Sequence, residues 1–258
     1  MDIHKPKPWH GLREFLKEYV IIVVGVLTAL GAEQLVETLH WNHRVGETRV
    51  QLNQELGADA GAGLRWLTNA PCLDAQLTAL SQAVAEARHT GTYRAPAQRY
   101  APTLVQFTND AWLNARSLQV SDHMGPEAVK LYSKAFFYPA ELATNITTLH
   151  SLAGELEPLD TDLDHVSPAE AGEWAARIGR IRELQARTEV AMTYTILSTD
   201  LVHEPIGLEM PQRFAADRRK LEGACVADPV TVLATLRDRS LSTRQQFEKL
   251  GLVYSREP

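Results

Sequence analysis

The feature that most constrains this chain is a run of 14 residues without a charged side chain, at residues 19–32 (YVIIVVGVLTALGA). As a helix this run is roughly 21 Å long, which is shorter than the ~30 Å hydrocarbon core of a bilayer. Apolar residues at helical spacing extend it as far as Leu12 on one side and Leu39 on the other. Trp9 and Trp41 bracket the extended stripe, as tryptophans do at membrane–water interfaces. The pattern predicts a membrane-spanning helix.

A cleaved signal peptide is the alternative interpretation of the same segment. Basic residues precede the run, and residues 29–31 (ALG) have the small-x-small form of a cleavage site. However, the preceding region also contains Glu14 and Glu18, and the apolar stripe continues past the site without a break. We therefore expect an uncleaved signal-anchor.

Lys and Arg residues around the span predict its orientation. Four of them lie within the first 18 residues, whereas only Arg44 and Arg49 lie in the comparable stretch beyond the span. The positive-inside rule then places the N-terminus in the cytoplasm. We expect a cytoplasmic tail (1–18), a transmembrane helix (19–39) and a periplasmic domain (40–258), anchored in a bacterial inner membrane.

Composition narrows the range of partners. Hydrophobic residues make up 45% of the 258 residues, which is enough for a sizeable core. The net charge is −6, whereas a nucleic-acid binder needs a basic face to neutralise phosphates. We expect no nucleic-acid partner. The expected partners are membrane lipid and either another membrane or envelope protein or a second copy of this chain.

The two cysteines, Cys72 and Cys225, each lie at an expected element boundary. An even number of cysteines in an oxidising compartment predicts a disulfide, which would agree with a periplasmic domain. The alternative is two independent buried thiols.

Apolar periodicity beyond the span predicts an all-α fold, in which the membrane helix continues into a bundle of five to seven helices. The first helix is expected to reach residue 69 and to break at Pro71. The clearest start signal runs from Ser167 to Glu170 (SPAE), with a serine cap, a proline in the first turn and a capping-box glutamate. Further helices are expected at residues 73–88, 103–118, 126–138, 140–156, 168–203, 229–239 and 242–250.

Small residues within the span are candidates for helix packing. Gly25 and Ala29, and likewise Thr28 and Ala32, form small-xxx-small pairs that allow two helices to approach closely in lipid. Such pairs also occur by chance in apolar segments. Self-association through this face is therefore one of two open interpretations.

Polar residues at the end of the span are candidates for a partner contact. Glu33, Gln34 and Glu37 follow the apolar run directly, and Trp41 lies one turn further on. Ionisable groups close to lipid are costly and are often functional. The alternative is that they lie in the hydrated headgroup region and simply end the span.

Motifs for catalysis or metal binding are weak. His40 and His43 are spaced to share a metal, but no third ligand follows in a recognisable pattern. The alternating aspartates at residues 160–164 lack the glycine and the glutamate of an EF-hand loop. We find no nucleophile elbow, phosphate-binding loop or zinc-protease motif. The sequence therefore predicts no catalytic residue, no cofactor and no metal site.

Three stretches near the N-terminus resemble a group of uncharacterised proteobacterial single-pass membrane proteins. They are residues 10–16 (HGLREFL), residues 26–34 (VLTALGAEQ) and the pair His40–Trp41. The shared features are a short basic tail, a membrane helix and an "ALGAEQ" exit. The resemblance covers about the first 45 residues. It implies a Gram-negative inner membrane and brings no activity, cofactor or site residue.

These observations favour a membrane-anchored protein whose periplasmic helical domain is an interaction or accessory module rather than an enzyme. A second hypothesis is a ligand-sensing bundle, which would have to signal through a partner because only 18 residues precede the span. A hydrolase with a site assembled from several helices is the third.

Overall fold

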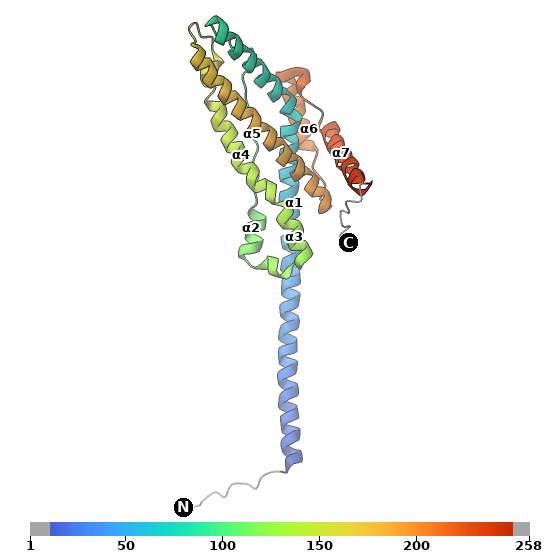
Figure 1. Cartoon of the computed structure of the whole chain (residues 1–258). Coiled ribbons are helices and arrows are strands. Elements are labelled where there is room, and N and C mark those ends of the chain that lie inside the picture. The colour runs from blue at the N-terminus through green and yellow to red at the C-terminus, as the bar shows by residue number, and fades with distance from the viewer. Residues whose placement is uncertain (1–10, 250–258) are drawn as a thin grey trace, which may run out of the picture.

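The computed structural model describes residues 11–249, with side chains up to residue 242. Its dominant element is α1 (Leu12–Thr90), one helix of 79 residues that is roughly 120 Å long. In Figure 1 residues 12–40 project alone, and we call them the stem. The other helices surround the later part of α1 and form the bundle with it. Stem and bundle therefore share one helix.

The described chain is helical throughout, apart from loops and one isolated bridge between Tyr93 and Leu163. Residues 11–249 contain no β-strand, so the predicted all-α fold is confirmed. After α1 the helices are α2 (Asp110–Ser117), α3 (Pro126–Ala135), α4 (Phe137–Gly154), α5 (Pro168–Leu201), α6 (Glu209–Glu222) and α7 (Pro229–Lys249). Short 3-10 turns are η1 (Val120–His123), η2 (Glu157–Asp160) and η3 (Gly223–Cys225).

The core of the bundle lies between α1, α4 and α5. A Cβ atom at Gly63 would lie 3.4 Å from the Cβ atom of Met192, so this glycine lets α1 and α5 approach closely. The largest core side chains come from α1 (Trp66, Leu73, Leu77, Leu80), α4 (Leu142, Ile146, Leu149) and α5 (Ile178, Ile181, Met192).

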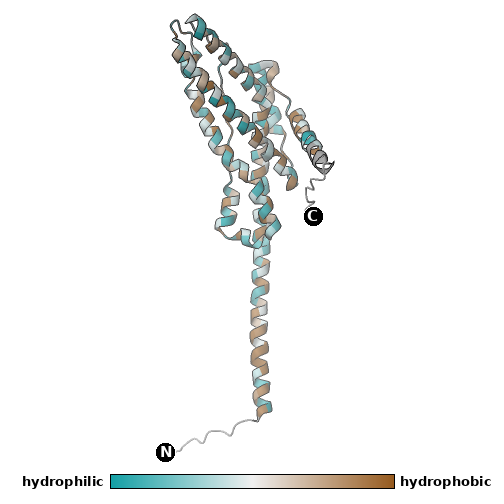
Figure 2. Cartoon of the chain, in the orientation of Figure 1, coloured by the Kyte–Doolittle hydropathy of each residue, from teal (hydrophilic) through white to brown (hydrophobic). Residues whose placement is uncertain are grey.

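The stem has no such cover. Its side chains are exposed or partly exposed, including Leu12 at 83% and Val36 at 67%. Figure 2 shows the apolar stretch along it. Among the residues that the structure describes, α1 alone is long and apolar enough to cross a membrane, and its most apolar window is not buried at all. Trp9, expected to bracket the span, lies outside the described residues.

The predicted break at Pro71 is wrong, because α1 continues through it and includes the helix expected at residues 73–88. A proline removes one helical donor and leaves the carbonyl of Leu67 without its usual partner. The Pro71 ring lies on the exposed face, where water can hydrate that carbonyl. Buried leucines such as Leu73 and Leu77 continue the core-facing stripe beyond the proline. Their packing outweighs the single lost hydrogen bond.

The helix expected at residues 103–118 is wrong in its first half. Only α2 is helical there, and residues 103–108 are extended. Burial alternates along this segment, with Val105 and Phe107 in the core and Leu104 and Gln106 on the surface. A period of two is typical of extended chain and not of a helix.

Local start and stop signals are confirmed elsewhere. The Ser167 hydroxyl accepts a hydrogen bond from the Glu170 N–H, and the Glu170 carboxylate accepts one from the Ser167 N–H. Pro126 begins α3, and the chain divides at Phe136, shortly before Pro139. The sequence analysis does not predict α6. The two helices expected at 229–239 and 242–250 are one helix, α7, up to residue 249; residue 250 lies outside the described residues.

Cys72 and Cys225 form a disulfide, as predicted. The bond joins α1 to η3, the turn between α6 and α7, and beside it the Ala227 N–H donates to the Thr68 carbonyl at 2.9 Å. Glu222 lies next to the two sulfur atoms, but sulfurs bonded to each other are not the thiolates that a metal requires. The disulfide therefore has a structural role and fixes α6 and α7 to the central helix.

We predict that Cys72→Ala combined with Cys225→Ala lowers the free energy of unfolding by about 2–4 kcal/mol, because the bond closes a loop spanning 153 residues. Denaturant unfolding of the full chain in detergent would measure the change. Wild type with reductant should unfold like the double variant. Equal stability with and without the bond would contradict the prediction.

Candidate functional site

The small residues predicted to pack in the membrane lie on the bare stem. Gly25, Ala29 and Ala32 are exposed, and a Cβ atom at Gly25 would meet nothing within 4 Å. Nothing in the described chain packs on this face. Helix association there stays a prediction about a second chain.

The residues predicted at the membrane boundary separate into two groups. Glu33, Gln34 and Glu37 are exposed on the stem. Trp41, in contrast, is half-buried at the base of the bundle, where its ring stacks on His123 with centroids 3.8 Å apart. The Arg44 guanidinium lies 5.3 Å from the same ring. Trp41 is therefore the point at which the free stem becomes a packed helix.

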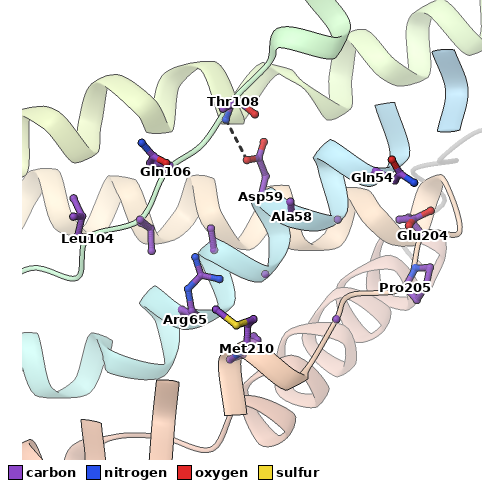
Figure 3. Close-up of a pocket in the computed structure, with 16 residues that line it drawn as sticks. Gln54, Ala58, Asp59, Arg65, Leu104, Gln106, Thr108, Glu204, Pro205 and Met210 are labelled. Carbon is purple, nitrogen blue, oxygen red and sulfur yellow. Dashed lines mark hydrogen bonds between the residues drawn. The ribbon is translucent and has the colours of Figure 1, made fainter. Parts of the chain in front are cut away.

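A groove of about 850 Å³ runs beside α1, between the extended residues 103–108 and the loop joining α5 to α6 (Figure 3). Small residues of α1 form its floor, and a Cβ atom at Gly61 would meet nothing within 4 Å. Its rims carry two exposed apolar side chains, Leu104 at 78% and Met210 at 60%. The volume is in the range of ligand sites in proteins.

Asp59 is the buried polar residue of this groove, at 3% exposure. Its Oδ1 accepts a hydrogen bond from the Thr108 N–H at 3.1 Å, whereas its Oδ2 has no hydrogen-bond partner among the described residues. Glu55, one turn earlier, accepts from the Ala111 N–H at 2.9 Å in the first turn of α2. Burial raises the pKa of Asp59 to about 8, and the nearby charge of Glu55 adds to the effect. Asp59 is therefore largely protonated at neutral pH.

Two half-buried charges lie toward opposite ends of the groove. Arg65 comes from α1 and Glu204 from the loop after α5 (Figure 3). Within residues 11–249 neither side chain has an ion-pair or hydrogen-bond partner. Burial lowers the pKa of Arg65, although an arginine stays charged at any physiological pH. Partly desolvated charges without partners are well suited to bind a ligand of opposite charge.

The extended segment on the rim has free backbone groups. Gln76 accepts from the Ala101 N–H and Asp59 accepts from the Thr108 N–H. Between them, in the described chain, the N–H groups of residues 103–107 make no hydrogen bond. Free backbone donors at an exposed edge can pair with an added chain.

Other polar clusters have a structural explanation. Gln185 in the core accepts from the Tyr100 hydroxyl and donates to Asp74 and Glu189, which ties α5 to α1. The aspartates at residues 160–164 are ion-paired with Arg94 and Arg99 in the loop after α1. His43 pairs with Glu47 rather than with His40. These contacts account for the side chains without a bound ion.

The groove is not predicted from the sequence, because Glu204 lies far along the chain from Asp59 and Arg65 and the three residues match no motif. Two signals were available. Residues 57–63 contain three glycines inside a helix. Glycine destabilises a helix interior, so three of them close together indicate a place where something packs closely or where space is left open. Residues 105–108 (VQFT) alternate apolar and polar side chains, which is a short signal of an extended segment next to that helix.

The chain matches no protein-family model, no curated protein and no solved structure.

We predict that stability falls as the pH rises from about 4 to about 8, because the folded-state pKa of Asp59 lies above its ordinary value of 3.8. In this window the unfolded chain has released the Asp59 proton while the folded chain retains it. Asp59→Asn should therefore be more stable than wild type at pH 8, by at least about 1 kcal/mol, and similar to wild type at pH 4.

Thermal and denaturant unfolding at several pH values would measure this difference. Glu189 contributes in the same direction, because burial raises its pKa to about 7, so the variant should flatten the pH dependence without removing it. A variant that is less stable than wild type at pH 8 would contradict the assignment of Asp59 as a neutral acid.

Proposed function

We propose that this chain is a single-pass inner-membrane protein whose periplasmic bundle binds another envelope protein. The observation that supports this most is the continuity of α1, which is bare and apolar over the stem and is the central helix of the bundle. An apolar surface of this length is far larger than the patches that soluble monomers expose. Lipid is the environment that stabilises it.

The orientation rests on two independent features. Basic residues are more numerous before the span than after it, which favours a cytoplasmic N-terminus. Cys72 and Cys225 are bonded, and structural disulfides persist in oxidising compartments such as the periplasm. Both features agree with a bundle on the periplasmic side.

The groove supports binding as the activity of the bundle. Asp59 lies 20 residues beyond residue 39, so the groove is roughly 30 Å along the helix from the end of the predicted span. It combines apolar rims, unpaired charges and unpaired backbone groups, which are features of a binding surface. A partner protein of the envelope can reach this height, whereas a lipid headgroup cannot.

We predict that a phosphatase reporter that is active only in the periplasm is active when fused to the C-terminus. A fluorescent reporter that requires the cytoplasm should be dark there. Cys72 and Cys225 should react with a thiol reagent only after denaturation and reduction. A fluorescent C-terminal fusion would reverse the proposed orientation, and recovery of the intact chain in the soluble fraction would remove the proposed anchor.

We also predict that a photo-crosslinking residue at Gln106 captures an envelope protein in living cells. The matched control is the same residue at Thr144, which is exposed on α4 and does not line the groove. The expected result is a discrete adduct from Gln106 that is absent from Thr144. The same pattern of adducts from both positions would speak against the groove as the binding surface.

A further inference from the structure

We propose that the groove binds an extended segment of the partner protein as an antiparallel strand beside residues 104–108. In this arrangement an acidic group of the segment meets Arg65 and a basic group meets Glu204. This inference rests on the proposed function and deepens it, since it names the kind of segment through which the partner protein would bind. Three features of the groove support it, namely its backbone, its charges and its floor.

The backbone of residues 104–108 offers one edge to the groove. In an extended chain the N–H and C=O groups of alternate residues point to the same edge. The Thr108 N–H points to Asp59 on α1, at 3.1 Å, so the N–H groups of Gln106 and Leu104 face the same way. Neither has a partner in the described chain. An added strand would pair with these groups, which is how sheet edges bind peptides.

The charges set the length and direction of the segment. Glu204 packs over Gly57, with its Cγ atom 3.3 Å from where a Cβ would lie, and Arg65 follows eight residues later on α1. Eight helical residues span about 12 Å, and four steps of an extended peptide span about 13 Å. A basic and an acidic residue at i and i+4 would therefore reach both charges from one face of the strand.

The direction of the bound segment follows from the way residues 104–108 run relative to the two charges. Figure 3 shows Leu104 and Arg65 toward one end, Glu204 toward the other, and Asp59 between them. Residues 104 to 108 therefore run from the arginine end to the glutamate end. A segment with its basic residue first lies with its N-terminal side at Glu204 and runs the opposite way. This is the antiparallel direction, which forms the more stable pairing.

The floor leaves room for the added backbone. A Cβ atom at Gly61 would meet nothing within 4 Å, so a side chain there would extend into the groove. Asp59 beside it has an unpaired Oδ2 atom, which as a protonated acid can hydrogen-bond an uncharged peptide group. Leu104 and Met210 on the rims offer apolar contact to alternate side chains.

The test uses the full chain in lipid nanodiscs and a pool of end-capped pentapeptides, Lys-x-x-x-Asp with x apolar or threonine. The control pool has the same composition in the reversed order, Asp-x-x-x-Lys. We expect members of the first pool to be retained roughly tenfold more than those of the second. In the antiparallel direction the reversed order brings like charges together, and it can match both charges only in the less stable parallel pairing. Equal retention, or no retention of either pool, overturns the proposal.

Two variants and one backbone measurement connect retention to the groove. Gly61→Leu should abolish retention, whereas Gly46→Leu, an exposed glycine of the same helix outside the groove, should not. Arg65→Gln should reduce the preference for charge order, because Glu204 still favours a basic residue at its end of the groove. Hydrogen exchange should slow at the Leu104 and Gln106 amides on binding and stay unchanged at Val105. Unchanged exchange at Leu104 and Gln106 would exclude strand addition.

Failure of this inference can be distinguished from failure of the proposed function. If Gly61→Leu leaves the cellular crosslinks to an envelope protein intact, the bundle remains an interaction module and the groove is not its contact surface. If the reporter fusions place the bundle in the cytoplasm, the proposed function fails, whatever the peptides do.

Discussion

The hydrogen-bonded backbone of α1 is the constraint on which the rest of the structure depends. One helix passes from a stem with exposed apolar side chains into the core of the bundle. Its two halves have different surroundings and cannot rotate independently, because no loop separates them. The face of α1 that turns toward the groove at Asp59 is therefore fixed relative to the face that carries Gly25 and Ala29. Any association of stems in the membrane would also set the relative orientation of two grooves.

Two features lie at the turn where the sequence predicts the end of this helix. Pro71 removes a donor in the middle of the bundle, and the Cys72–Cys225 disulfide follows immediately. The proline ring faces solvent, where water can hydrate the unpaired carbonyl, whereas Cys72 and Leu73 face inward and attach this turn to the rest of the bundle. The disulfide attaches α6 and α7 at this turn. Since the loop between α5 and α6 carries Glu204, the same bond helps to hold the far wall of the groove in place.

The parts of the fold that could be predicted are those with local signals. The apolar run, the cap at Ser167, the proline that begins α3 and the two cysteines each depend on neighbouring residues or on a simple count. The effect of Pro71 on the helix depends on the face of α1 that the proline occupies. The packing of α1 against α5 decides this face, so the local sequence does not predict that the helix continues. Phe107 and Trp112 favour a helix over residues 103–118, although the alternation of side chains over residues 105–108 indicates extended chain. Arg65 and Glu204 line the same groove only in the folded chain, so no spacing in the sequence predicts that they belong to one site.

Asp59 connects the stability of the bundle with the groove. A carboxyl group buried to 3% exposure and held neutral opposes folding as the pH rises, and an amide of the same shape would avoid that cost. A buried acid that costs stability is the kind of exception often found at functional sites. Here the exception lies on the floor of a groove whose rim has free backbone groups and whose ends carry unpaired opposite charges. The destabilising acid, the missing side chain at Gly61 and the free backbone edge of residues 104–108 have a common explanation if the groove receives another chain.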